Sequence, residues 1–256
     1  MKVCGNVLVA ILGAVFVVPL LCIAALSLSP TYGMDIFTTL QPSTRWWREL
    51  LADPSWLIAL ATSTAVGCGS SLVAIALTLP AALAWRLEGS VAARNAMLLA
   101  GVSLTFPPVV LAVGLYQTVM RLGLFDTAPG LALAHLSFTI PIAAIVLSAR
   151  FRATPIELYL AARSLGARRI AAAVRWVSAT QKMTLVGCFA ASVLTSISEI
   201  TVTMYVTDAS VPTIARRALA GVTRDLKPTG FAALAAWLML LCLLVFPLVR
   251  RLGKES

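Results

Sequence analysis

Six apolar runs dominate the sequence, and each is long enough to cross a lipid bilayer as a helix. A spanning helix needs about 20 consecutive, predominantly apolar residues. Charged residues make up 12% of the chain, about half the share that is usual in soluble domains. The pattern predicts an all-α, polytopic membrane protein with a single transmembrane domain over residues 1–256. We expect the six spans at about residues 4–28, 57–85, 95–120, 131–147, 184–206 and 231–248.

The first apolar run could instead be a signal peptide, because it follows the basic residue Lys2. Its apolar part is longer than the core of about 7–15 residues found in signal peptides, and no small-x-small cleavage site closes it convincingly. We therefore expect this run to remain in the protein as the first span.

The distribution of lysine and arginine residues predicts that both termini lie in the cytoplasm. With the N-terminus inside, 13 of the 20 Lys and Arg residues are cytoplasmic, and segment 148–183 supplies seven of them. Cytoplasmic loops of membrane proteins are enriched in these residues. The net charge of +10 is thereby explained without a nucleic acid partner.

No sequence motif for catalysis or for ATP binding is present. The chain lacks a Gly-x-x-x-x-Gly-Lys-Ser/Thr string, a His-Glu-x-x-His string and a nucleophile elbow, and it has one histidine. Its five cysteines are widely spaced and lie mostly in apolar runs, where cysteine behaves as a small hydrophobic residue. We expect neither an enzymatic activity nor a cofactor, a metal site or a disulfide framework.

The segment between the fourth and fifth spans is basic, and it predicts two short helices over residues 155–180. Gly166 suits the left-handed position that ends a helix. Pro155 suits the first turn of the helix before it, where a missing N–H is no loss. In the second helix, apolar residues share one face at helical spacing: Ile170, Val174 and Val177. Taken alone, this pattern also fits an ordinary basic cytoplasmic loop.

The string Ala161-Ala162-Arg163-Ser164-Leu165-Gly166-Ala167 resembles the cytoplasmic EAA loop of permease subunits of bacterial binding-protein-dependent ABC importers. The family pattern begins E-A-A-x-x-x-G and ends I-x-L-P. This chain departs from it at Leu160, which stands in place of the glutamate. At the end of the pattern, Trp176, Ser178 and Ala179 stand in place of I-x-L-P.

The resemblance implies a multi-pass permease of the bacterial cytoplasmic (inner) membrane, nearest to the spermidine/putrescine type. Such a subunit forms half of a translocation pathway for a polyamine or a similar small solute, and it works by alternating access. The implied partners are a dimer of cytoplasmic ATP-binding subunits, a second homologous permease and a periplasmic or lipid-anchored substrate-binding protein. The loop would couple the spans to the ATPase through Glu157, Leu160, Ala161, Ala162, Arg163, Leu165, Gly166, Ala167, Arg169 and Ile170.

Polar and helix-breaking residues inside the spans are candidates for the translocation pathway or its gate. A carboxylate within an apolar span is costly and marks a pathway or a structural pair. We therefore expect Glu199 to line the route, with help from Ser196 and Ser198; the alternative is a solvated position near the external interface. The stretch around Glu199 also resembles the acidic position of spermidine/putrescine permeases.

Two further features of the spans join this list of candidates. His135 precedes Pro141, a combination that recurs in the same permeases, and it fits either a packing histidine or a pathway residue. The pair Pro107-Pro108 removes backbone donors and must break its helix, which a membrane tolerates only where protein or a cavity covers the gap.

The external loop over residues 208–227 is rich in arginine. In the family, loops on this side meet the substrate-binding protein, so the resemblance implies that role for Arg216, Arg217 and Arg224. The alternative is a solvated helix at the membrane interface.

Two functions from other classes remain possible on the sequence alone. A proton-coupled secondary transporter would use Glu199 and His135 as a proton relay, although the absence of an inverted repeat counts against it. A non-transporting membrane scaffold would explain the replacement of the family glutamate by Leu160.

Overall fold

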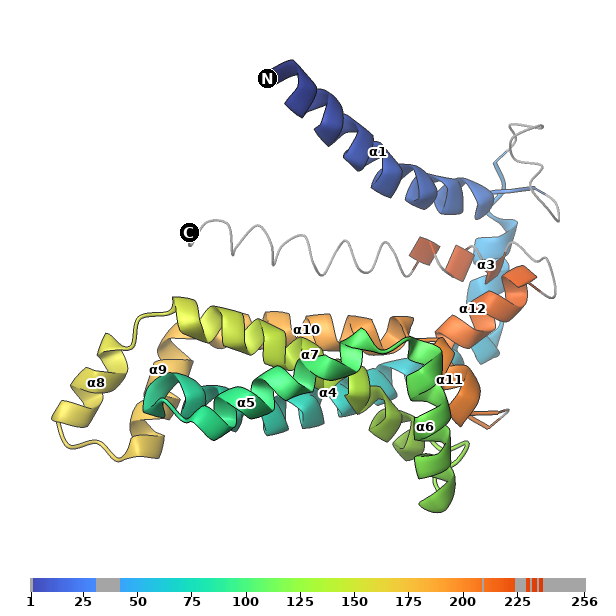
Figure 1. Cartoon of the computed structure of the whole chain (residues 1–256). Coiled ribbons are helices and arrows are strands. Elements are labelled where there is room, and N and C mark those ends of the chain that lie inside the picture. Colours follow the sequence, from blue (N-terminus) through green and yellow to red (C-terminus); the bar gives the residue numbers. More distant parts are fainter. Residues whose placement is uncertain are drawn as a thin grey trace. The chain divides into compact units, whose positions relative to one another are not determined.

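The computed structural model describes residues 2–30, 42–208, 210–223 and, between positions 229 and 236, residues 229, 230, 232, 233, 235 and 236. All regular elements in this part of the chain are helices, which confirms the all-α prediction (Figure 1). Contacts between residues divide the chain into two units. The larger unit comprises Ala61–Thr213 with Leu248–Ser256, and the smaller one Met1–Leu60 with Ile214–Pro247.

Two of the described helices are individually long and apolar enough to cross a membrane. They are α4, Pro54–Glu88, and α7, Ala128–Ala153, and they include the predicted second and fourth spans. Helix α1, Lys2–Leu26, coincides with the predicted first span. The predicted sixth span, 231–248, lies largely outside the described residues, so a total of six spans stays a prediction.

Two bent helix pairs raise the number of candidate spans to four if each pair counts as one. The first pair joins α5 (Val91–Ala100) and the short 3-10 helix η1 (Gly101–Thr105) to α6 (Pro108–Arg121), with a bend of 108°. The second joins α9 (Arg169–Thr180) to α10 (Lys182–Ser198), with a bend of 78°.

The bend in the third predicted span lies at the tandem prolines, as the sequence predicted. Phe106 is extended, Pro107 precedes α6, and Pro108 is the first residue of that helix. Proline at this position loses no intrahelical hydrogen bond, because the first N–H groups of a helix have no partner within it.

The predicted fifth span is not one continuous helix, and this corrects the placement of Glu199. Helix α10 ends at Ser198, and the short helix α11 covers Thr201–Val206. Glu199 lies in the break with an extended backbone, and its Oε1 accepts a hydrogen bond of 2.9 Å from the N–H of Val202. The carboxylate thus satisfies one of the free N–H groups at the start of α11.

In the larger unit, α4, α5, α7 and α10 pack together and share one apolar core (Figure 1). Small residues allow α4 to approach α10 closely: a Cβ built on Gly67 would lie 3.2 Å from Cγ1 of Ile197. At the start of α7, Gly130 is obligatory, since a Cβ there would lie 2.0 Å from the carbonyl oxygen of Leu124.

The loop before α7 is tied to the end of α11 through Asp126. Its carboxylate accepts hydrogen bonds from the N–H groups of Asp208 (2.7 Å) and Ser210 (3.0 Å), and its own N–H donates to the carbonyl of Val206. Burial alone would raise the pKa of Asp126, but these hydrogen bonds outweigh it and hold the pKa below its usual value. Asp126 has a positive φ of 53°, which an aspartate tolerates better than most residues.

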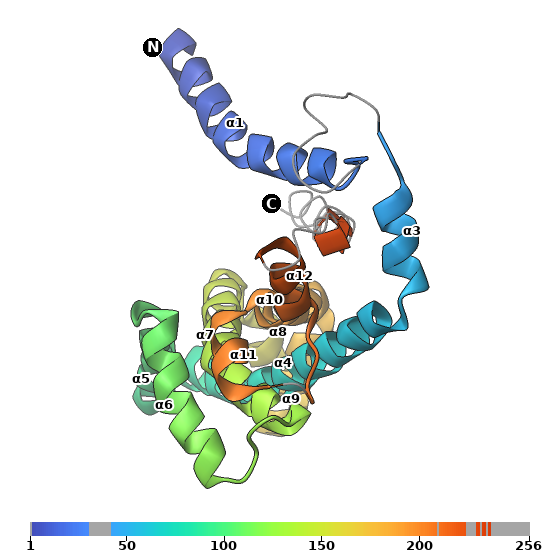
Figure 2. The ribbon, with the colours of Figure 1, turned by 90° about the vertical axis from the view of Figure 1, so that its right-hand side faces the viewer.

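In the smaller unit, helix α3 (Arg45–Ala52) is held by its tryptophans. The buried Trp46 donates its Nε1–H to the carbonyl of Ser29 at 2.7 Å, and Trp47 donates to the hydroxyl of Ser27 at 3.3 Å. Helix α12 (Ile214–Thr223) packs beside Trp56 through Ala218. Figure 2 shows both helices from a second direction.

Candidate functional site

The basic segment between α7 and α10 folds as a helix, a glycine turn and a second helix, as the sequence predicted. Helix α8 covers Glu157–Ser164, and α9 follows the turn. Gly166 has a φ of 83°. Its N–H donates to the carbonyl of Arg163, and the N–H of Ala167 donates to that of Ala162. This pair of bonds defines a Schellman motif.

The prediction that Pro155 lies in the first turn of α8 is wrong, because the helix begins shortly after this residue. Helix α8 begins at Glu157, so Pro155 lies in the short connection between α7 and α8. Its carbonyl oxygen accepts a hydrogen bond of 2.8 Å from Nε1 of Trp176. Pro155 therefore helps to fix α9 rather than to start α8.

One face of the α8–α9 insert is part of the core of the larger unit. Trp176 has no exposed surface, and its ring meets Phe151 of α7 edge to face, with 5.2 Å between centroids. The other buried members of the insert are Tyr159, Ala162 and Ala172, which belong to one cluster with residues of α4, α5, α7 and α10. The insert is thus joined to the helical bundle by ordinary core packing.

Polar contacts reinforce this junction at the end of α7. Arg86 of α4 donates from Nε to the carbonyl of Phe151 (2.7 Å) and from Nη2 to that of Thr154 (2.9 Å). The carbonyl of Phe151 also accepts a long bond of 3.4 Å from the N–H of Thr154. A cation at the C-terminal end of a helix is favourable. The fully buried Gln181, between α9 and α10, donates to the hydroxyl of Thr154 at 2.9 Å.

The opposite face of the insert exposes large apolar side chains. Leu160 is 50% exposed, Leu165 88% and Ile170 80%. Leu158, Ala161 and Leu165 follow one another at helical spacing and form an exposed stripe along α8. The guanidinium of Arg163 does not extend from this surface, because Nη1 donates to the carbonyl of Ala167 at 2.7 Å.

The structure divides the residues predicted to contact an ATPase into two groups. Most of them are exposed: Glu157, Leu160, Ala161, Arg163, Leu165, Gly166, Arg169 and Ile170. Ala162 is buried and Ala167 is half-buried, so the small side chain of Ala162 serves packing within this chain and is not available to a partner. The exposed stripe is of the kind that docks in an apolar groove of another protein.

A second group of predicted residues meets around the break between α10 and α11. His135 of α7 is buried, and its Nδ1 hydrogen-bonds to the hydroxyl of Ser196 at 2.7 Å. Its Nε2 hydrogen-bonds to the hydroxyl of Thr203 at 3.2 Å. Ser70 of α4 adds a longer contact of 3.4 Å to Ser196. His135 thus connects three helices and spans the break.

A cavity of about 10 Å³ is lined by His135, Ser196 and Glu199 together with residues of α4 and α11. This volume is about the smallest that holds one water molecule. Among the other predicted pathway residues, Ser198 is exposed and donates to the carbonyl of Thr195. Pro107 and Pro108 are also exposed.

In the smaller unit, Arg217 has a structural role that the sequence did not indicate. Its Nη2 lies 2.9 Å from Oδ2 of Asp53, and its guanidinium covers the ring of Trp56 at 4.9 Å. Hydrogen bonds from Ser55 first, and the charge of Arg217 second, lower the pKa of Asp53. Arg216 is half-buried, and Arg224 lies outside the described residues.

The fold of this chain is similar to that of one chain of a solved ABC transporter. The chain resembles one chain in the crystal structure of a bacterial ABC transporter involved in the import of the acidic polysaccharide alginate, with a TM-score of 0.68 at 15% identity. The similarity covers 98% of this chain and 95% of the other. At this level of identity the similarity concerns the fold alone.

Sequence similarity points to the same class of proteins. The chain is 34% identical over 155 residues to the trehalose transport system permease protein SugB of Mycobacterium tuberculosis, which covers 58% of this chain and 55% of SugB. It is 32% identical over 123 residues to ORF1 of Streptomyces antibioticus, named as an ABC transporter permease, covering 48% and 54%.

The chain therefore spans about half the length of these curated relatives. No family model matches the sequence. The relatives are transporter permeases, as the resemblance in the basic segment predicted. None of them supports the spermidine/putrescine type in particular, since the cargoes that are named are a sugar and a polysaccharide.

Proposed function

We propose that this chain is a membrane-spanning permease subunit of an ATP-driven ABC importer, and that the α8–α9 insert couples its spans to a separate ATPase. The observation that carries the proposal is the two-faced insert. One face is buried in the bundle through Trp176 and Ala172, and the other exposes Leu160 and Leu165. An element of this kind can transmit a displacement from a bound partner to the spans.

The insert moves the spans because its attachment is stiffer than a loop. Helix α8 docks in a groove of the ATPase through its exposed leucines. The displacement passes to α7 through Trp176 and to α10 through Gln181, which lies directly between α9 and α10. Arg86 passes it on from the end of α7 to α4. ATP binding shifts the permease between its two states only if the insert contacts the two ATPase states with different free energies.

In this proposal, the translocation pathway opens at the C-terminal end of α10, far from the insert along this helix. There His135 connects α7 to both sides of the break between α10 and α11. The adjoining cavity is closed to any solute in this conformation, at about 10 Å³. Glu199 and Ser196 line the route in this proposal, which opens when α10 and α11 separate from α7. A second permease subunit supplies the other half of the pathway.

The cargo in this proposal is a carbohydrate. Support comes from the cargoes of the similar proteins, which are trehalose for SugB and alginate for the transporter of similar fold. A substrate-binding protein delivers the cargo on the outer side, where Arg216 and Arg224 are its candidate contacts. Arg217 is a weaker candidate, since its guanidinium is already engaged by Asp53 and Trp56. The protein resides in the bacterial cytoplasmic membrane.

The test is an uptake assay with the complex purified from its native membrane and reconstituted in liposomes. Labelled trehalose and alginate oligosaccharides are supplied with the binding protein, and ATP is placed on the ATPase side. We expect carbohydrate uptake that requires ATP and continues when the proton gradient is dissipated. Uptake that needs the proton gradient alone would establish a secondary transporter acting through Glu199 and His135. Uptake of putrescine but not sugar would restore the polyamine assignment, and no uptake at all would favour a scaffold.

A further inference from the structure

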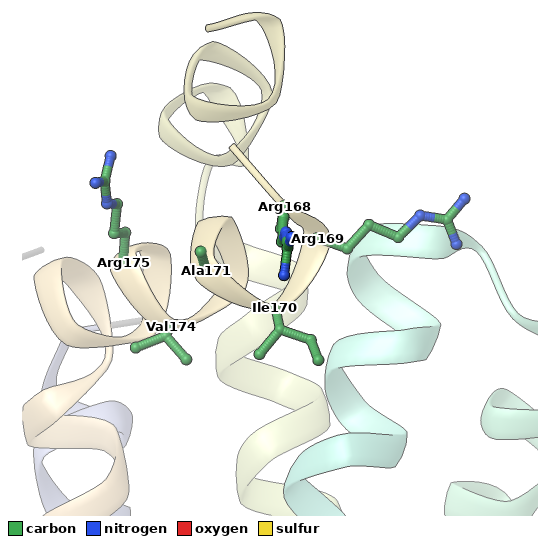
Figure 3. A pocket seen from close by; sticks show the side chains of 6 residues that line it. All are labelled: Arg168, Arg169, Ile170, Ala171, Val174 and Arg175. Carbon is green, nitrogen blue, oxygen red and sulfur yellow. The ribbon is translucent and has the colours of Figure 1, made fainter. Parts of the chain in front are cut away.

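Helix α9 is an amphipathic helix that lies across the end of a candidate span, since its axis makes an angle of 78° with that of α10. Ile170 and Val174 extend from the same side of α9, whereas Arg175 extends from the opposite side (Figure 3). Both apolar side chains are largely exposed, Val174 at 60%. This combination is typical of helices that rest at a membrane interface.

The apolar side of α9 forms a groove with the spans. A cavity of about 340 Å³ is lined by Leu79 and Leu83 of α4, by Val174 and Val177 of α9, and by Leu185 of α10. Its polar lining residues are Ser178 and Lys182. The groove lies at the C-terminal end of α4, a candidate span, and at the N-terminal end of α10, which forms a second candidate span together with α9.

Cations line this groove and two neighbouring hollows. Val174 also lines two neighbouring hollows: one of about 220 Å³ beside Glu88 and Arg169, and one of about 750 Å³ between Arg168 and Arg175. Four cations and one carboxylate line the three hollows together. The carboxylate, Glu88, lies 3.7 Å from Arg169, so most of the positive charge is left without an acidic counterpart within the hollows.

We propose that this groove binds an anionic phospholipid. One acyl chain lies against Leu79, Leu83 and Leu185, and the phosphate is held by Lys182, which lines the groove. A largely apolar groove that has a cation, Lys182, in its lining matches the two halves of such a lipid. Basic pockets between spans on the cytoplasmic side bind anionic headgroups for the same reason. The proposal requires that α4 and α10 cross the membrane, and it does not depend on ATPase coupling.

The bound lipid contacts both α9 and α4, and no residue of the exposed stripe of α8 lines the groove. The lipid therefore packs against α9 and leaves Leu160 and Leu165 accessible. In this position the lipid stabilises the angle between α9 and α10.

The test uses the full chain in phosphatidylcholine nanodiscs that contain a small amount of spin-labelled phosphatidylglycerol or spin-labelled phosphatidylcholine. Electron paramagnetic resonance measures the immobilised fraction of each labelled lipid. We expect phosphatidylglycerol to be immobilised preferentially. Lys182→Gln should weaken its binding roughly fivefold, the effect of one cation near an anionic lipid. Leu83→Trp should fill the groove and remove the excess of immobilised phosphatidylglycerol over phosphatidylcholine.

Arg94→Gln is the matched control, because Arg94 is an exposed arginine of α5 that does not line the groove. It should leave the preference unchanged. Equal immobilisation of both lipids by the unaltered chain would overturn the proposal. So would an equal loss of preference in Arg94→Gln and Lys182→Gln, since the attraction would then be diffuse. Crosslinking of Val174→Cys to a second permease chain or to the ATPase would assign the groove to a protein partner.

Discussion

The attachment of the α8–α9 insert to the helical bundle depends most on the side chain of Trp176. Replacing this residue should loosen the insert while the bundle itself stays folded. Trp176→Ala removes a fully buried ring, which costs about 3–5 kcal/mol in a packed core. It also removes the hydrogen bond to the Pro155 carbonyl, worth about 0.5–1.5 kcal/mol. The edge-to-face contact with Phe151 contributes about 0.5–1.5 kcal/mol more. The insert should therefore be weakened by at least about 4 kcal/mol.

Trp176→Phe is the graded partner of this variant. It keeps an aromatic ring in the core and loses mainly the N–H donor, so we expect a cost of about 1–2 kcal/mol. The matched control is Trp47→Phe, which removes the same donor from a half-buried tryptophan of α3. Hydrogen exchange over residues 157–180 measures the attachment, and the ratio of ATP hydrolysed to solute transported measures coupling.

We expect exchange in the insert to rise from the unaltered chain to Trp176→Phe and again to Trp176→Ala. ATP hydrolysed per solute should rise in the same order, because the ATPase still binds α8 but no longer moves the spans. Trp47→Phe should change neither quantity. A Trp176→Ala protein with a loosened insert and an unchanged coupling ratio would refute the reasoning, since coupling would then not pass through this junction.

Three further perturbations follow from the described contacts. Gly130→Ala should prevent stable folding, seen as loss of monodisperse protein after extraction, because its Cβ would lie 2.0 Å from the carbonyl oxygen of Leu124. Gly114→Ala, with nothing within 4 Å of the added Cβ, should be tolerated. Asp126→Asn should lower the melting temperature at neutral pH and not at low pH. The lowered pKa of Asp126 means that its contribution is present above the unfolded-state pKa and is lost as the pH falls through the folded-state pKa. Glu199→Gln keeps an acceptor at the start of α11, so folding should persist while uptake falls; unchanged uptake would leave Glu199 with a capping role only.

Features set by local backbone chemistry could be predicted from the sequence. The turn at Gly166 depends on a positive φ that glycine readily adopts, and the break at Pro107-Pro108 depends on the fixed φ and missing N–H of proline. Long apolar runs also identified α4 and α7, because few structures other than a membrane-spanning helix accommodate such segments.

Features set by contacts between distant segments could not be predicted. Trp176 was noted in the sequence only as a departure from a family pattern, because its burial depends on Phe151 and Pro155. Arg86 directly follows the predicted second span, and nothing near it in the sequence indicates that it caps the end of α7. The break at Glu199 had a local signal, a carboxylate three residues before Val202, but the surrounding apolar residues suggested an unbroken span.

The exposure of the leucines on α8 follows from both kinds of information. The sequence gives their spacing, and only the burial of Tyr159 and Ala162 against the bundle decides which side of α8 is left open. Leu160 lies on the open side, so the replacement of the family glutamate alters the chemistry of the proposed docking surface without removing it.

The central claim is that the open side of α8 contacts an ATPase, and crosslinking tests it most directly. Ala161 is exposed and its neighbour Ala162 is buried, so cysteines at these two positions differ in direction and in little else. In a background without the native cysteines, Ala161→Cys should crosslink to the ATP-binding subunit in native membranes, and Ala162→Cys should not. Capture of only lipid or of no partner at Ala161, with the complex otherwise active, would contradict the account.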